Sequence, residues 1–382
     1  MYNLAEYGAM IADKGRTAAY ARALEQLVKP GSVVLDVGCG PGILSLLACR
    51  AGAARVYAVE QADLIDLARE LAAANGFADR IHFIQATSTE LELPEAVDGI
   101  VSDLHGVVPL FRTAIVSILD ARDRFLKPGG WVIPARDTLW TAIVTSPQAH
   151  QQIVTAWDTE YGFDLSAAKR RAINLYEGRR IESADLLSAP QCWSTLDYRE
   201  LGSPSAAGEV SCIVERGATG HGIGVWFDCE TAAGIGLSNS PASGEHHVYS
   251  QAFFPWPAAT MLSAGDTVRI NIRADFVVDD YVWTWSTDVS EPVPCSKAGV
   301  SYRQSTFFGD TAGARRWRRR AHTFVAAAGR DATVDRLILE LMDRRMPLGE
   351  IASEILIAFP SIFRDWETAL GRVGELSDRY DR

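Results

Sequence analysis

In the first 135 residues, short apolar runs alternate with segments in which apolar residues recur every three or four positions. The runs that we expect to be strands are Val33–Val37, Arg55–Val59, Ile81–Ile84, Gly99–Ser102 and Trp131–Pro134. Strands separated by helical segments in this way are typical of a parallel sheet with helices on both faces. Residues 1–30 have helical spacing that ends at Pro30-Gly31, which predicts helix before the sheet.

Beyond Pro134 the pattern changes to β-rich runs punctuated by glycine and proline. The clearest of these runs are Gly222–Phe227, Thr267–Ile272 and Tyr281–Trp285. They predict an antiparallel barrel or sandwich. A segment of helical character at about 156–200 interrupts these strands.

From about residue 301 the spacing is helical again, with one apolar stripe around Leu337 and Leu341 and another around Ile355. Three short helices with a break at Pro347 are similar to a winged-helix or helix-turn-helix unit, and a small helical cap is the alternative. The basic cluster Arg315–Arg320 precedes them and is either a solvated helix face or a binding patch.

Composition and charge narrow the classes of function. A chain of 382 residues is long enough for two or three domains, and its net charge of -11 argues against a nucleic-acid partner while allowing a cationic peptide. The six cysteines form no CxxC pair and no signal-peptide pattern begins the chain, so we expect a reduced, cytoplasmic protein. No apolar stretch approaches the roughly 20 residues that span a bilayer, which predicts no membrane segment. The histidines lack partners at metal-ligand spacing, so no metal is expected.

A glycine-rich turn follows the first predicted strand. Its residues Asp36, Gly38, Gly40 and Gly42 are followed, at the end of the second strand, by Glu60. Glycines let the backbone approach a ligand closely, and a carboxylate can accept hydrogen bonds from both ribose hydroxyls. A dinucleotide site needs Gly-x-Gly-x-x-Gly, and here the third glycine comes one residue earlier. This tighter spacing resembles S-adenosylmethionine-dependent methyltransferases, whereas a tight turn without a ligand would not require the carboxylates.

The segment Met10–Thr17, together with Tyr20, resembles the helix that covers the cofactor in protein arginine methyltransferases and their bacterial relatives. By this resemblance Met10 lies over the sulfonium and Arg16 pairs with the methionyl carboxylate, a role that suits a guanidinium. Residues 86–90 are similar to the strand end that binds adenine in the family. The resemblance therefore implies S-adenosyl-L-methionine as cofactor, bound by Met10, Arg16, Asp36, Gly38, Gly40, Gly42, Glu60, Ser88 and Thr89.

The same resemblance, which covers residues 7–290, implies the domain organisation. We expect a Rossmann-like α/β methyltransferase domain over 1–134 and an antiparallel β-barrel domain over 135–300. The helical segment at about 156–200, which begins near Tyr161–Ser166, would be a dimerisation arm, so a homodimer is expected. The small helical, winged-helix-like domain over 301–382 lies outside the resemblance.

The acceptor side of the site departs from the family pattern. In the family two glutamates hold the substrate guanidinium, and here Asp103 stands at the first position and Arg112 at the second. A positive charge at the second position would repel a guanidinium. Counting back from Gln251, the histidine and tryptophan of a second family loop fall on Val248 and Tyr249, with His247 one residue away.

These features predict a methyltransferase that acts on a nitrogen or oxygen of a peptide or protein side chain, with arginine as the family default and a non-guanidinium acceptor as our hypothesis. If the acceptor must lose a proton, Asp103, His105 or His247 could take it, while Arg112 would anchor an acidic or amide group. The alternatives are that His105 only packs under its loop and that Arg112 faces solvent. Two rival functions remain: a small-molecule methyltransferase of a biosynthetic pathway, and a non-catalytic binding protein that keeps the fold.

Overall fold

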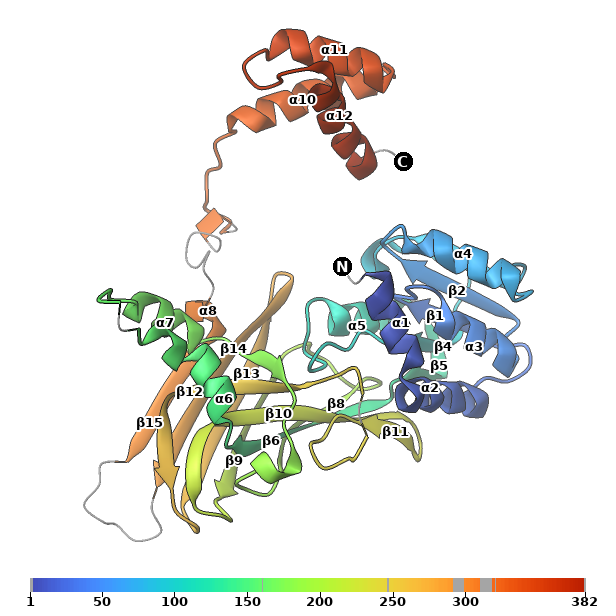
Figure 1. Cartoon of the computed structure of the whole chain (residues 1–382). Helices are drawn as coiled ribbons and strands as arrows, with labels where there is room; N and C mark the ends of the chain where they lie inside the picture. The colour runs from blue at the N-terminus through green and yellow to red at the C-terminus, as the bar shows by residue number, and fades with distance from the viewer. Residues whose placement is uncertain are drawn as a thin grey trace. The chain divides into compact units, whose positions relative to one another are not determined.

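The computed structural model describes residues 3–159, 161–245, 247–290, 299–309, 318–319 and 321–380. Its contacts divide the chain into one unit up to Thr311 and a second unit from Ala312 onward (Figure 1). The first unit holds two of the predicted domains, the parallel sheet and the antiparallel sheets.

The N-terminal part of the first unit is a five-stranded parallel sheet in the order β3-β2-β1-β4-β5. Its strands are β1 (Val33–Val37), β2 (Arg55–Glu60), β3 (Ile81–Gln85), β4 (Val97–Ser102) and β5 (Leu126–Ile133). The chain order reverses between β1 and β4, and ligands of such sheets bind in the crevice at the carboxyl ends of the strands at that point. The predicted parallel sheet is confirmed, with β5 extending back through the expected turn at Lys127–Gly130.

Helices and a short 3-10 turn surround this sheet. They are α1 (Leu4–Ala12), α2 (Lys14–Leu27), α3 (Ile43–Ala51), α4 (Leu64–Ala74), η1 (Ser88–Glu90) and α5 (Ala114–Phe125). The helix expected before the sheet is divided at Asp13, which ends α1 and begins α2. Its carboxylate accepts the backbone N–H of Arg16 at 3.0 Å, as an N-capping side chain does. Tyr20 on α2 is fully buried against the sheet.

The second part of the unit contains two antiparallel sheets, ordered β7-β12-β10-β6-β8, with β11 beside β10, and β15-β14-β13-β9. The strands are β6 (Arg136–Val144), β7 (Glu177–Arg179), β8 (Gln191–Asp197), β9 (Ala206–Ile213), β10 (Ala218–Ala232), β11 (Ile235–Ser238), β12 (Gln251–Leu262), β13 (Thr267–Val277), β14 (Asp280–Ser290) and β15 (Val300–Ser305). Buried tryptophans fill the core between them, and Trp256 on β12 donates to Thr287 on β14 at 3.2 Å. These sheets form the predicted barrel domain.

The segment expected to be a dimerisation arm contains α6 (Pro147–Ile153), η2 (Thr155–Trp157), α7 (Ser166–Ala172) and η3 (Ser183–Asp185). Its helical part is shorter than the range 156–200, because β7 already pairs with β12 and β8 pairs with β6. Tyr161 and Phe163 are 83% and 75% exposed. A short helix, α8 (Thr306–Gly309), ends the described part of this unit.

Among its described residues, the second unit includes the helices α10 (Arg330–Asp343), α11 (Leu348–Ala358) and α12 (Trp366–Tyr380). Their predicted apolar stripes meet in a separate core that includes Ile338, Ile351 and Val373. The described residues of this unit contain no strand and so show no wing, and both the helix-turn-helix unit and the helical cap stay open. In the basic cluster, Arg318 and Arg319 are exposed, and Arg315, Arg316, Trp317 and Arg320 lie outside the described residues.

Candidate active site

A cavity of about 560 Å³ lies at the carboxyl ends of β1, β2 and β4. It is lined by the glycine-rich turn, by α1 and α2, by the loop after β4, and by Tyr249 from the barrel. Nine predicted site residues line it: Met10, Arg16, Gly38, Gly40, Glu60, Ser88, Asp103, His105 and Arg112. The other four, Asp36, Gly42, Thr89 and His247, lie outside its lining.

The turn after β1 requires glycine for both its conformation and its space. Gly38 and Gly40 have φ angles of +72° and +52°, which other residues rarely adopt. A Cβ at Gly38 would lie 2.5 Å from the side chain of Leu104, and one at Gly40 would lie 3.0 Å from the ring of Tyr7. Because these two residues have no side chain, the backbone itself forms this part of the cavity wall.

The carboxylate of Glu60 is fixed at this wall by two backbone donors. Its Oε2 accepts the N–H of Gly40 at 3.1 Å, and its Oε1 accepts the N–H of Ala62 at 3.0 Å. Each carboxylate oxygen has two lone pairs, so both keep capacity for a vicinal diol such as that of a ribose. The geometry therefore fits a nucleoside-bearing cofactor.

Asp36 links the strand before the turn to the helix that follows it. It is fully buried, accepts the Ser45 hydroxyl on α3 at 2.6 Å, and leaves its Oδ1 without a hydrogen-bond partner among the described residues. Burial raises the pKa of Asp36 to about 7. Its contacts join β1 to α3 and do not reach the cavity.

Asp103, which follows β4, is the centre of a polar network on the opposite side of the cavity. Its Oδ2 pairs with the guanidinium of Arg16. Its Oδ1 accepts the hydroxyls of Tyr249 at 2.7 Å and Tyr20 at 3.1 Å, and lies 3.1 Å from Nδ1 of His105. Three of these neighbours thus share Oδ1, while Oδ2 meets only the Arg16 guanidinium among the described residues.

His105 connects Asp103 to a second buried carboxylate. Its Nε2 lies 2.9 Å from Oδ2 of Asp137 on β6, and the same oxygen accepts the Tyr198 hydroxyl at 2.6 Å. Burial by itself would lower the pKa of His105, but the Asp137 carboxylate outweighs it and the pKa is raised well above its ordinary value. Since both ring nitrogens face carboxylates, both carry hydrogen and the ring is an imidazolium. His105 is therefore placed as a proton donor.

One group of side chains has the composition of a metal site. Ligand atoms of His105, Asp137 and Cys229 lie within 4.8 Å of one another, and all three residues are buried. Burial raises the pKa of the Cys229 thiol to about 12, and Nε2 of His105 already makes its hydrogen bond to Asp137. An ion would have to displace that bond, so the contacts as they stand describe a hydrogen-bonded pair.

Arg112 lies at the rim of the cavity, where it is exposed. Its backbone has a positive φ of 45°, and its N–H donates to Asp280 at the start of β14 at 3.2 Å. The guanidinium lies over the ring of Phe111, 5.2 Å from the centroid, and no described carboxylate forms an ion pair with it. Its charge is therefore available at the mouth of the cavity.

His247 has a different position from the one that a catalytic base would need. Its Nδ1 lies 3.0 Å from Oδ1 of Asp13, and Oδ2 of the same carboxylate accepts the N–H of Val248 at 2.9 Å. A Cβ at Gly15 would lie 2.7 Å from the imidazole, so glycine lets the ring pack on the start of α2. Burial of Asp13 would raise its pKa, but hydrogen bonds from the Arg16 backbone, the Val248 backbone and His247 lower it. His247 thus fastens the barrel loop to α2, which carries Arg16.

Sequence reasoning missed several members of this network. Asp13, Asp137 and Tyr198 received no role, and Tyr20 and Tyr249 were noted only as parts of motifs. One signal was available for Asp137, because it occupies an inward-facing position in the alternating strand β6, where a carboxylate is costly without a partner. No pattern in the sequence showed that its partner would be His105.

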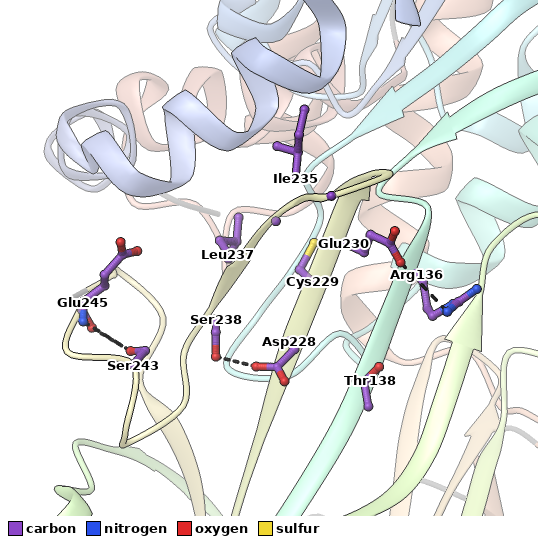
Figure 2. Close-up of a pocket in the computed structure, with 12 residues that line it drawn as sticks. Arg136, Thr138, Asp228, Cys229, Glu230, Ile235, Leu237, Ser238, Ser243 and Glu245 are labelled. Carbon is purple, nitrogen blue, oxygen red and sulfur yellow. Dashed lines mark hydrogen bonds and ion pairs between the residues drawn. The ribbon is translucent and has the colours of Figure 1, made fainter. Parts of the chain in front are cut away.

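A second hollow, of about 470 Å³, lies over β10 and β11 (Figure 2). Its charged side chains already have partners: Arg136 lies 3.9 Å from Glu230, the Ser238 hydroxyl donates to Asp228, and Glu245 lies 3.1 Å from Nε2 of His247. Apart from Cys229, it shares no residue with the network around Asp103. The first cavity therefore remains the candidate active site.

Two family models match consecutive parts of the chain. Residues 14–135 match the family model of ribosomal protein L11 methyltransferase, and residues 135–287 match that of the arginine methyltransferase oligomerization subdomain. The protein arginine N-methyltransferase 6 of Danio rerio is 34% identical over 254 residues, which cover 62% of this chain and 72% of that protein. The chain belongs to the protein arginine methyltransferase family.

Other members of the protein arginine methyltransferase family give the same picture. The probable protein arginine N-methyltransferase 6 of Arabidopsis thaliana is 35% identical over 244 residues, covering 61% of this chain and 55% of that protein. The match thus spans little more than half the length of that relative.

Among solved structures, a Trypanosoma brucei PRMT1 enzyme-prozyme heterotetrameric complex with AdoHcy is similar in fold, with a TM-score of 0.71. The sequences are 26% identical, and the match covers 78% of this chain and 97% of that one.

No helix in the described residues is long and apolar enough to cross a membrane.

Proposed function

We propose that this arginine methyltransferase-family protein transfers a methyl group from S-adenosyl-L-methionine to a nitrogen or oxygen of a peptide or protein side chain, and that the acceptor is not a guanidinium. One observation carries the proposal: a single cavity is lined by Glu60 and the glycine turn on one side and by Asp103, His105 and Arg112 on the other. Such a cavity can hold a nucleoside cofactor and an acceptor together, which is the main requirement of an in-line transfer.

The residues present fit this cofactor. Glu60 offers free lone pairs for the ribose hydroxyls, and Gly38 and Gly40 leave room for the nucleoside. Met10 and Arg16 line the same cavity and would hold the methionyl end. When bound, the cofactor supplies a methyl group on a positively charged sulfur. A solved relative of 26% identity, named as a complex with AdoHcy, supports the same cofactor.

The contacts of Asp103 argue against arginine as acceptor. The guanidinium that pairs with Oδ2 of this carboxylate is the chain's own Arg16, and two tyrosines and His105 lie on Oδ1. A substrate guanidinium that bound both oxygens would have to displace some of these neighbours, next to the positive charge of Arg112. The positive charge of Arg112 would repel a positively charged acceptor at close range, which selects against a guanidinium.

We also propose that the protein is a homodimer formed through the segment after α6. Tyr161 and Phe163 are large, apolar and exposed there, and such exposed side chains mark protein contacts. The match of residues 135–287 to an oligomerization subdomain supports this assembly. The described cysteines are free, which is compatible with the reduced, cytoplasmic location that the sequence predicts.

Labelled cofactor tests the proposal. The protein is incubated with S-adenosylmethionine carrying a labelled methyl group and with peptides that differ only in a central arginine, glutamine or glutamate. We expect label in the acidic or amide peptides. Efficient labelling of the arginine peptide, retained in Arg112→Ala, would contradict the non-guanidinium acceptor, and a failure to label any peptide would count against methyl transfer to peptides.

A further inference from the structure

We propose that the acceptor atom is a carboxylate oxygen and that the product is a methyl ester. This inference rests on the proposed function and narrows it to one substrate class.

Among the described residues, each carboxylate that lines the cavity is already engaged in a hydrogen bond or ion pair. Oε2 of Glu6, at the exposed start of α1, accepts the N–H of Asn3 at 2.7 Å, and Glu60 is bound at the cofactor side. Asp103 pairs with Arg16 and accepts two tyrosine hydroxyls, and His105 is already protonated between two carboxylates.

Two further titratable groups of the cavity wall, Cys39 and Tyr249, are protonated as well. Burial raises the pKa of the Cys39 thiol far above neutrality and the pKa of the Tyr249 hydroxyl to about 12. An ammonium, amide or hydroxyl acceptor must lose a proton during methylation, and a positioned base normally takes it. A carboxylate is deprotonated already at neutral pH and needs no base.

The charges at the acceptor side point to the same class. Arg16 is balanced by Asp103, and His105 is balanced by Asp137. Arg112 is left at the rim with a guanidinium that forms no ion pair among the described residues and contacts only an aromatic ring. A guanidinium matches the two oxygens of a carboxylate in shape as well as in charge, so Arg112 would orient an anionic acceptor.

The transfer balances without any further group. One carboxylate oxygen donates an electron pair to the methyl carbon, and the bond between that carbon and sulfur breaks. The pair stays on sulfur, which becomes a neutral thioether, and the carboxylate becomes a neutral ester. Since one negative and one positive charge disappear together, no proton has to move.

The experiment uses the full chain, labelled S-adenosylmethionine and degenerate peptide libraries with one fixed central residue: aspartate, glutamate, asparagine, glutamine, arginine or lysine. After the reaction, mild alkali is applied, because it hydrolyses methyl esters to volatile methanol and leaves N-methyl groups in place. We expect label in the aspartate or glutamate library, at least tenfold above the amide libraries, and its release as methanol. The rate should not rise between about pH 6 and pH 8, since no base is needed.

Binding provides a second readout that does not depend on turnover. With S-adenosylhomocysteine present, a fluorescent glutamate library should bind the wild type at least tenfold more tightly than a glutamine library. Arg112→Gln should abolish this preference and Arg112→Lys should keep part of it. Both replacements must adopt the positive φ of residue 112, so any backbone strain is common to the two variants. Arg136→Gln, in the hollow of Figure 2, is the control and should change nothing.

The outcomes separate the inference from the proposed function. Label that resists alkali, or an acidic preference that survives in Arg112→Gln, overturns the carboxylate acceptor and leaves a peptide methyltransferase. Label in no library overturns both.

Discussion

Replacing Asp137 with asparagine tests the buried pair on which our interpretation of His105 depends. The carboxylate is completely buried and faces two donors, Nε2 of His105 at 2.9 Å and the Tyr198 hydroxyl at 2.6 Å. Asparagine keeps the shape of the side chain but removes the charge. It also places an NH₂ group where the neighbours are themselves donors.

The expected loss of stability is large. Two opposite charges about 4 Å apart interact by about 4 kcal/mol at an effective dielectric constant near 20. Removing one partner of a buried pair costs roughly 3 to 5 kcal/mol, and His105 would keep only Asp103, which also pairs with Arg16. We expect Asp137→Asn to lower the free energy of unfolding by this amount at about pH 6.

The size of the effect should depend on pH. The pKa of His105 is raised in the folded state above its ordinary value of 6.5. The stabilisation is therefore complete below pH 6.5 and is lost as the pH rises through the folded-state value. In Asp137→Asn most of this dependence disappears, so the difference between wild type and variant should shrink toward high pH by up to about 1.4 kcal/mol per unit.

Urea unfolding followed by tryptophan fluorescence measures this difference, since Trp226, Trp256, Trp283 and Trp285 are buried in the barrel. Asp66→Asn is the control, because Asp66 is 74% exposed and pairs only with Arg69 one turn away. The control should change stability by less than about 0.5 kcal/mol. A loss below about 1 kcal/mol for Asp137→Asn, or a loss that stays constant with pH, would refute the imidazolium assignment.

Two further predictions concern assembly and the C-terminal unit. The protein should have the mass of a dimer in light scattering, and the double variant Tyr161→Ser, Phe163→Ser should be monomeric at micromolar concentration; a monomeric wild type would refute the arm. Removing residues 314–382 should leave the affinity for S-adenosylhomocysteine unchanged and reduce turnover of the true peptide substrate, because this unit has its own core and lies outside the family match. Unchanged turnover on that substrate would make the unit a structural cap.

The sequence predicted the parts of this molecule that depend on local patterns. The strand Val33–Val37 is fixed by its apolar run, and the turn after it by glycines whose positive φ angles other residues rarely adopt. The position of Glu60 at the end of β2 follows from the short connection of a βαβ unit. All of these lie within about thirty residues of one another.

The acceptor side could not be predicted in the same way, because its contacts join distant segments. The pair of His105 and Asp137 links a loop of the parallel-sheet domain to a barrel strand, and the pair of Asp13 and His247 spans more than two hundred residues. Counting from Gln251 placed the family histidine on Val248, whereas the imidazole that docks on α2 belongs to His247. The arm was expected to be helical up to about residue 200 because nothing local showed that β7 would pair with β12.

The binding of S-adenosylhomocysteine tests the central claim, that the cavity beside the glycine turn is the cofactor site. Isothermal titration should give one site per chain for the wild type. Glu60→Ala should weaken binding by about 1 to 3 kcal/mol, since the hydrogen bonds that the ribose hydroxyls donate to the charged carboxylate are lost. Glu92→Ala, an exposed glutamate outside the cavity lining, should bind as the wild type does. A wild type that shows no binding, or a Glu60→Ala variant with unchanged affinity, would contradict the account.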